Sequence, residues 1–201
     1  MSKETPLIGG HYYHIYNRGN NRENLFIEER NYQYFLNLYV RYIYPVADTY
    51  AYCLMKNHFH LLVRLHPAAD LAGLQDLPGL TPDYSKSFSN LFNAYTKTIN
   101  KTYQRTGSLF EKPFKRILVD SDNYLIHLVS YIHRNPQKHG FTSDFRSYPY
   151  SSYQTIHAQK NSRLQHQQVL EWFGNLQIFE NYHDACDEQK IASLIEDDIA
   201  E

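Results

Sequence analysis

The sequence lacks features that mark several specialised classes of protein. It holds only two cysteines, Cys53 and Cys186, and no C-x-x-C pair, so a disulfide framework is not expected. No run reaches the ~18 apolar residues of a membrane-spanning helix. The opening residues MSKETPLIGG lack the apolar stretch of a signal peptide. These absences predict a reduced, cytoplasmic protein with no membrane partner.

The net charge is also small, because the charged side chains of the 201 residues sum to −1. That average by itself argues against a nucleic-acid partner, but the distribution reverses the inference. Residues 1–163 hold 19 Lys or Arg against 12 Asp or Glu, whereas residues 164–201 hold one basic residue against nine acidic ones. A body with a balance of +7 precedes a tail with a balance of −8, and such asymmetry favours a polyanionic partner for the body.

Aromatic residues, in contrast, are plentiful, with 19 Tyr, 11 Phe and one Trp. Tyrosine can pack in a core, stack on nucleic-acid bases or attack phosphorus. Most of these residues must be structural, so abundance alone identifies no functional tyrosine.

Strand and helix patterns alternate along most of the chain. Alternating apolar residues and turn signals predict strands at 10–20, 48–57, 58–65 and 111–119. Apolar residues at i, i+3, i+4 and i+7 predict helices at 27–43, 83–104 and 122–136, the last stopped or kinked by Pro136. Residues 66–82 are expected to form a loop or an irregular insertion.

The order β-α-β-β-α-β-α predicts an α+β fold of the ferredoxin-like, split βαβ type. Its antiparallel sheet has four to five strands with two helices on one face, and a further helix and short C-terminal helices follow. Residues 141–163 are expected to be irregular, and 166–173 and 180–197 to be helical. We interpret residues 1–163 as one domain and 164–201 as an acidic helical extension of the same domain.

Two histidines, His58 and His60, occupy alternate positions of a predicted strand, in the segment YCLMKNHFHLLVRL. Alternate residues of a strand point to the same face, so the imidazoles project together while Phe59 and Leu61 point to the other face. This pattern recurs where two ring nitrogens bind one metal ion. The alternative is a pair of partly exposed histidines with no ligand. A third ligand and a reactive group nearby would favour the metal.

The helix predicted at 122–136 offers such groups. His127, Tyr131 and Asn135 follow one another at i, i+4 steps and therefore lie on one side of the helix. Tyr131 is a candidate nucleophile, and the amide oxygen of Asn135 suits a hard divalent cation. His127 is a supporting residue or an alternative ligand. The alternative for Tyr131 is a structural tyrosine at the edge of the core, because spacing alone does not bring this helix to the strand.

Several segments together resemble the single-tyrosine HUH transposases. More narrowly, they resemble the REP-associated tyrosine transposases and their insertion-sequence relatives. The segments, which follow the expected order from about residue 10 to 155, are HYYHIYNRGNNRENLF, YCLMKNHFHLLVR, GSLFEKPFKR, YIHRNPQKHG and YPYSSY. His58-Phe59-His60 matches the motif that names the group, which is histidine, a bulky hydrophobic residue and histidine. Tyr131 matches the family tyrosine, and Asn135 stands at the position of the third metal ligand.

The resemblance implies an enzyme that cleaves and transfers single strands of DNA. The helix at 122–136 becomes the catalytic helix, and Tyr131 forms a 5′-phosphotyrosine and frees a 3′-OH. His58, His60 and Asn135 would hold one metal ion. An amide oxygen and phosphate chemistry favour Mg²⁺ or Mn²⁺ over zinc. Because an unperturbed tyrosine has a pKa near ~10, Tyr131 needs help to lose its proton.

The resemblance also implies the partners. The substrate would be single-stranded DNA with a hairpin, bound by phosphate contacts and base stacking, which would associate the protein with the nucleoid. Relatives include dimers, in which Tyr131 would meet the histidines of the other subunit, so a homodimer is left open. The basic side chains expected to contact DNA are Arg18, Arg22, Lys97, Lys101, Arg105, Lys112, Lys115 and Arg116.

Other functions remain open to the residues alone. One is a catalytically silent DNA- or RNA-binding regulator on the same scaffold, although such a binder needs no complete His, His, Tyr and Asn set. Another is a zinc hydrolase, for which no carboxylate base stands in a recognisable motif. The acidic tail is a solvated face, a dimerising or packing segment, or a segment that folds over the basic groove and competes with DNA.

Overall fold

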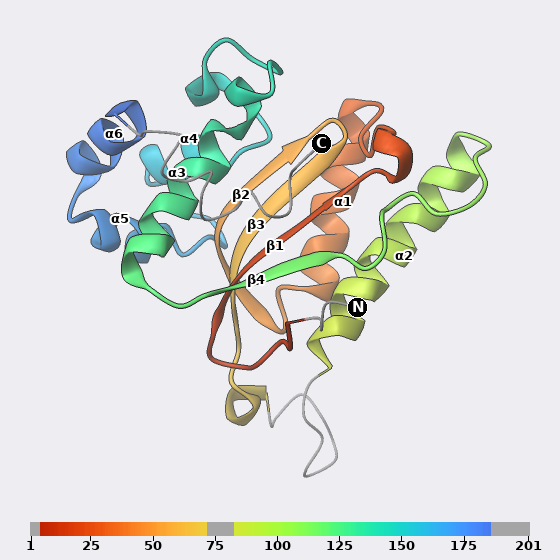
Figure 1. Cartoon of the computed structure of the whole chain (residues 1–201), viewed down its shortest axis with the longest axis horizontal. Coiled ribbons are helices and arrows are strands. Elements are labelled where there is room, and N and C mark those ends of the chain that lie inside the picture. Colours follow the sequence, from red (N-terminus) through yellow and green to blue (C-terminus); the bar gives the residue numbers. More distant parts are fainter. Residues whose placement is uncertain (1–4, 72–82, 186–201) are drawn as a thin grey trace.

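The strands form one antiparallel sheet in the order β2-β3-β1-β4 (Figure 1). β1 and β3 are the inner strands, and β1 pairs antiparallel with both β3 and β4. This order confirms the predicted α+β, split βαβ fold. The computed structural model describes residues 5–71 and 83–185. Within them the strands are β1 (Tyr12–Arg18), β2 (Ala47–Met55), β3 (His58–Leu65) and β4 (Lys115–Val119).

Two groups of helices cover the two faces of the sheet (Figure 1). α1 (Glu29–Tyr42) and α2 (Tyr84–Thr102) bury their apolar sides against one face. The other face lies against α3 (Asp122–Lys138) and α5 (His166–Phe173), and α4 (Tyr153–His157) and α6 (Leu176–Ala185) contribute to the same core. Each face of the sheet therefore has a core of its own.

The alternation of β3 divides its side chains between these cores. Phe59, Leu61 and Val63 are buried against α1 and α2, which confirms that Phe59 and Leu61 point to the face opposite the histidines. Leu62 is buried in the core beneath α3. His58 and His60 share the face of Leu62, because alternate residues of a strand point the same way. Both strand histidines thus face the α3 side of the sheet.

Local sequence signals begin the long helices close to where they were predicted. A capping box joins Glu28 and Asn31 at the start of α1. Asp83 accepts a 2.8 Å hydrogen bond from the backbone of Lys86 at the start of α2. Ser121 caps α3 in the same way. Each helix consequently begins within about two residues of its predicted start.

The predicted start of β4 and the predicted end of α3 are wrong, and both involve proline. β4 begins at Lys115 and not at residue 111, because Pro113 has no N–H to donate to the sheet ladder. α3 continues through Pro136 to Lys138, so this proline does not stop the helix. Pro136 removes only one backbone hydrogen bond, and the backbone N–H of His139, just after the helix, donates to the Asn135 carbonyl at 3.0 Å.

The C-terminal part is more regular than predicted. The stretch 141–163 contains α4 and a 3₁₀ turn at Phe145–Ser147. α6 begins at Leu176 rather than at 180, and residues 186–197 of the predicted helix lie outside the described residues. Phe173 and Phe179 are buried in the core beneath α3, so the start of the acidic tail packs on the body. The division at residue 163 stays a prediction, as does the competition between the tail and DNA.

Two predicted absences concern membranes and thiols. None of the helices in residues 5–71 and 83–185 is long and apolar enough to cross a membrane. Cys53 is a free thiol, and burial raises its pKa, so it stays protonated and unreactive. Cys186 lies outside the described residues.

Candidate active site

Cross-strand neighbours build the floor of the site on the α3 side of the sheet. His58 of β3 lies opposite Arg18 of β1, and His60 lies opposite Tyr16. Tyr16 in turn lies opposite Lys115 of β4. Directly opposed residues point to the same face, so two imidazoles and two cations are gathered on one patch of the sheet.

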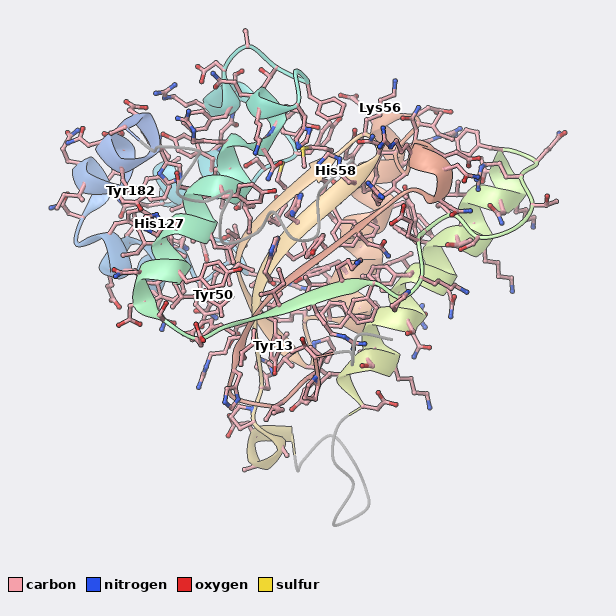
Figure 2. All side chains as sticks on the ribbon, viewed as in Figure 1. Tyr13, Tyr50, Lys56, His58, His127 and Tyr182 are labelled. Carbon is pink, nitrogen blue, oxygen red and sulfur yellow. The ribbon has the colours of Figure 1, made fainter. Side chains whose placement is uncertain are left out.

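A pocket of about 340 Å³ opens over this patch. Its walls come from the ends of β1 and β3, the start of β4, the Glu111 loop and His139 just after α3. Figure 2 shows the labelled His58 at the end of the β2–β3 hairpin beside Lys56. Arg18, Arg22 and Lys115 line the pocket against a single carboxylate, that of Glu111. The excess of positive charge suits a phosphate-bearing ligand.

Helix α3 brings Tyr131 onto this floor. The ring of Tyr131 packs edge-on against His60, with 5.4 Å between ring centroids, and against His14 at 6.2 Å. The Lys138 Nζ lies 5.7 Å from the centroid of the tyrosine ring. The structure thus brings together the helix tyrosine and a strand histidine, a meeting that spacing along the chain could not establish.

Asn135 lies one turn after Tyr131 and is fully buried. Its side-chain nitrogen donates to the Tyr131 carbonyl at 3.3 Å, which turns the amide so that only the oxygen is available. Within the described part of the chain, that oxygen is buried and accepts no hydrogen bond. A buried acceptor without a donor is costly, and a cation is one group that would relieve the cost.

The tautomer of His58 also suits a metal ion. The Asn57 side-chain oxygen accepts a 2.7 Å hydrogen bond from the Nδ1–H of His58. The proton therefore resides on Nδ1, and Nε2 keeps its lone pair. A ligating histidine is usually oriented by a bond of this kind at its other nitrogen.

Both strand histidines are held neutral. Burial lowers the pKa of His58 to about 3, and the nearby His139 and Arg18 act in the same direction. Burial also lowers the pKa of His60 well below its usual value, with His14 contributing next. A neutral imidazole is the form that binds metal, so the ring nitrogens are available at neutral pH.

By donor type, His58, His60 and Asn135 suit one divalent cation. Two imidazole nitrogens and an amide oxygen are acceptable ligands for Mn²⁺ or Mg²⁺. Across residues 5–71 and 83–185, no three His, Cys, Asp or Glu side chains are grouped to hold an ion by themselves. The remaining ligands would have to come from Asn135, water or a phosphate oxygen, as is usual for Mg²⁺.

Two histidines at the site were missed by the sequence analysis. His14 bonds to His60, and His139 packs edge-on against His58 with 4.8 Å between ring centroids. A signal was present for each. His14 occupies an alternate position of its strand, and His139 continues the i, i+4 series beyond Asn135. Ending the helix at Pro136 removed His139 from that series.

His127, in contrast, does not reach the pocket. It bonds to the Tyr182 hydroxyl of α6, and Figure 2 shows these two labelled residues together, away from His58. The i, i+4 series of α3 therefore diverges, with Tyr131 directed to the sheet and His127 to α6. The supporting role and the alternative ligand role predicted for His127 find no contact in this geometry.

A second, larger groove of about 510 Å³ adjoins the pocket and shares Asn17 and Glu111 with it. It runs between α2 and the loop that leads into β4, and it includes Lys112 and Arg116. Arg116 donates to the Ser85 hydroxyl at 2.8 Å. Because Lys115 and Arg116 are adjacent in β4, they point to opposite faces of the sheet. The two cavities thus meet around the β4 edge.

The remaining predicted DNA contacts differ in their surroundings. Arg18 bonds Glu111 at 2.6 Å at the mouth of the pocket. Arg105 is held by Glu23 and by the Asn100 side chain, the latter at 2.7 Å. Lys97 and Lys101 are exposed on α2 and line neither cavity. The structure therefore separates a pocket group from an outer group on α2.

Comparisons with known proteins agree with this geometry. Residues 8–135 match the family model described as transposase, IS200-like. A curated REP-associated tyrosine transposase of Haemophilus influenzae is 27% identical over 110 residues. These residues are 55% of this chain, and the chain spans 60% of the length of that relative.

A solved structure of a REP-associated tyrosine transposase bound to a REP hairpin has the same fold. The TM-score is 0.60 at 17% sequence identity, and the match covers 79% of this chain and 87% of the other. At this level of identity the likeness speaks for the fold and for the order of its elements.

Proposed function

This chain belongs to the IS200-like transposase family, and from that membership we propose that it cleaves and rejoins single-stranded DNA. Tyr131 is the nucleophile, and His58, His60 and Asn135 hold one Mg²⁺ or Mn²⁺ ion. The substrate is DNA that carries a hairpin, since one relative of the same fold is a transposase bound to a REP hairpin. The product of the first step is a 5′-phosphotyrosine with a free 3′-OH.

The observation that carries the proposal is the contact between Tyr131 and His60. The two rings meet at 5.4 Å between centroids, although the residues are far apart in the chain. A nucleophile must lie within reach of the group that stabilises its target. The pocket beside them is lined by Arg18 and Lys115, which would hold a phosphodiester in place.

The residues proposed as ligands offer two types of donor atom. His58 and His60 offer neutral ring nitrogens, and Asn135 offers the buried oxygen that lacks a donor in the described residues. The ion would supply Lewis acidity at the scissile phosphate and offset the charge that builds on its oxygens.

The chemical step conserves the energy of the phosphodiester. The Tyr131 Oη attacks phosphorus, the bond from phosphorus to the 3′ oxygen breaks, and the 3′ oxygen leaves as a hydroxyl after gaining a proton. Tyr131 releases its own proton to solvent in the same step, and solvent returns one to the 3′ oxygen, so protons balance. The Lys138 Nζ lies 5.7 Å from the centroid of the tyrosine ring, where its positive charge would attract the phosphate that Tyr131 attacks. A second 3′-OH then reverses the reaction and joins a new strand.

The two cavities suggest the path of the DNA. The scissile phosphate would sit over His58 and His60, and the flanking nucleotide would pass around the β4 edge into the larger groove. Lys112 and Arg116 line that groove and would contact the backbone of the strand. Lys97, Lys101 and Arg105 would contribute weaker contacts from the outer surface, and Arg22 would close the pocket near Arg18.

The test is a covalent adduct. Full-length protein, labelled single-stranded hairpin DNA and Mn²⁺ should yield a protein–DNA species that survives denaturation. Tyr131→Phe should abolish it. Tyr124→Phe is the matched control, because it removes another buried hydroxyl from the same helix and should leave the adduct intact.

The other outcomes discriminate between the alternatives. An adduct that persists in Tyr131→Phe would mean that another tyrosine is the nucleophile. DNA binding without any adduct would favour the catalytically silent regulator. Mixing Tyr131→Phe chains with His60→Ala chains tests the homodimer, since only an exchange of Tyr131 between subunits would restore the adduct.

A further inference from the structure

His14 is a polar residue in a position that is otherwise apolar. It lies in the middle of β1 and is fully buried. Its direct neighbours on the adjacent strands are Leu62 and Ile117. An aliphatic side chain would fill such a position without any cost of burying polar atoms. The imidazole therefore needs an explanation beyond packing.

Among the described residues, the His14 side chain makes a single hydrogen bond, and it is made to His60. Nε2 of His14 lies 2.9 Å from Nδ1 of His60. Among the residues that the structure describes, Nδ1 of His14 has no hydrogen-bond partner. An unpaired buried nitrogen costs about 1–3 kcal/mol. The position thus retains a costly imidazole whose side-chain hydrogen bond is made to a proposed metal ligand.

Ring packing holds His14 rigidly in that contact. Its ring stacks on Tyr16 with 4.7 Å between centroids and lies nearly parallel to His60 at 5.1 Å. Tyr131 closes a third side edge-on. With the ring held in this way, the direction of the bond to His60 is set by the sheet and not by a mobile side chain.

The bond to His60 can be made in two ways. Either the Nδ1–H of His60 donates to Nε2 of His14, or the reverse holds and His60 carries its proton on Nε2. Only the first leaves the lone pair of His60 Nε2 available. His58 already has the equivalent arrangement, since Asn57 accepts its Nδ1–H.

We propose that His14 is the positioning residue for the metal site, accepting the Nδ1–H of His60 so that Nε2 of His60 binds the ion. This inference rests on the proposed function, because it requires the ion at His58 and His60. His14 then does for His60 what Asn57 does for His58. An imidazole suits the task because its acceptor nitrogen reaches across the strand pair, whereas Asn57 serves only its neighbour in sequence.

The experiment measures binding of Mn²⁺ alone to full-length protein without DNA, by loss of the free Mn²⁺ signal in electron paramagnetic resonance. His14→Phe keeps a ring of similar shape and removes the acceptor. It should weaken Mn²⁺ binding by about 10–100-fold. His14→Gln restores an acceptor and should recover the affinity to within about fivefold. His183→Phe removes a buried histidine from a bond to another histidine on α3 and should not change the affinity.

A second measurement needs no variant and holds even if His14→Phe fails to fold. In protein labelled with ¹⁵N-histidine and loaded with Mg²⁺, the ring spectrum of His60 should show its proton on Nδ1. A proton on Nε2 of His60 would overturn the inference, as would unchanged Mn²⁺ affinity in folded His14→Phe.

One further variant separates this failure from failure of the proposed function. His58→Ala should abolish Mn²⁺ binding. If it does and His14→Phe binds as wild type, only the inference is wrong. If His58→Ala binds Mn²⁺ as well as wild type, the metal site itself is wrong and the inference falls with it.

Discussion

Two groups of histidines, buried or partly buried, lie on opposite sides of α3, and they use their ring nitrogens differently. In the core histidines, His133 and His183, every ring nitrogen is bonded. They bond each other at 2.8 Å, and their other nitrogens bond the Ser152 hydroxyl at 2.8 Å and the Phe179 carbonyl at 2.7 Å. In the site histidines, defined as His14, His58 and His60, the described residues show side-chain hydrogen bonds only from His58 Nδ1 to Asn57 and between His14 and His60.

The difference separates a structural role from a functional one. Burial lowers the pKa of the histidines in both groups, so burial alone does not distinguish them. The hydrogen bonding of the ring nitrogens does distinguish them, because a structural polar group is normally fully hydrogen-bonded. His58 and His60 instead line a pocket, and in each ring the Nε2 has no hydrogen-bond partner among the described residues, as a ligand requires. The following predictions test that division.

The largest expected effect is loss of catalysis in His58→Ala. Removing a metal ligand should slow adduct formation by about 10³-fold, because several kcal/mol of charge stabilisation are lost. The free energy of unfolding should change by less than about 1 kcal/mol, since His58 is only partly buried and has a single local bond. Adduct kinetics and urea denaturation measure the two quantities. A large loss of stability with normal catalysis would reverse the assignment.

The core histidines should respond in the opposite way. His183→Leu leaves the buried Nδ1 of His133 without its partner and removes the ring contacts of a fully buried imidazole, so it should lower the free energy of unfolding by about 2–4 kcal/mol. Adduct formation below the unfolding transition should stay within about twofold of wild type. The same denaturation and adduct assays apply. Catalysis lost in step with stability would mean that the two sides of α3 are not independent.

Acid should destabilise the fold through the core histidines. Burial lowers the pKa of His183 from 6.5 to about 3, so between these values the unfolded chain binds a proton that the folded protein does not. The free energy of unfolding must therefore fall as the pH falls through this window. One such histidine contributes about 1.4 kcal/mol per pH unit.

His183→Gln removes that titrating group. The decline in unfolding free energy between about pH 6 and pH 4.5 should accordingly be shallower by about 1.4 kcal/mol per pH unit than in wild type. Urea denaturation at a series of pH values measures the slope. An unchanged slope would show that His183 titrates alike in the folded and unfolded states.

The smallest effect concerns DNA binding on the site side. Lys115→Gln should reduce the dependence of log K on log salt by about 0.7 for a single-stranded oligonucleotide, because one phosphate contact is lost. Lys160→Gln is the control, since Lys160 is exposed after α4 and lines neither cavity of the site. Fluorescence anisotropy at several salt concentrations gives both slopes. Equal slopes for the two variants would place the strand elsewhere.

Much of the fold was predictable because its signals are local. Predicting the strand order required only the alternation of apolar residues in strands, their spacing in helices and the order of the elements along the chain. The shared face of His58 and His60 follows from the two-residue period of a strand, and the side of α3 that carries Tyr131 and Asn135 follows from the helical period. The end of α3 was predicted wrongly because Pro136 lies close to the C-terminus of the helix. There its missing N–H costs one backbone hydrogen bond, and the helix continues to Lys138.

The amino-acid sequence by itself determined the split βαβ fold, the pairing of the two strand histidines and the placement of Tyr131 one turn before Asn135. Each of these depends on backbone periods that neighbouring residues specify. Only the tertiary structure decided that Tyr131 packs on His60, that His14 bonds His60, and that His139 and Glu111 reach the same pocket. Such contacts join residues distant in the chain, and they depend on how the sheet and α3 pack, which no local pattern encodes.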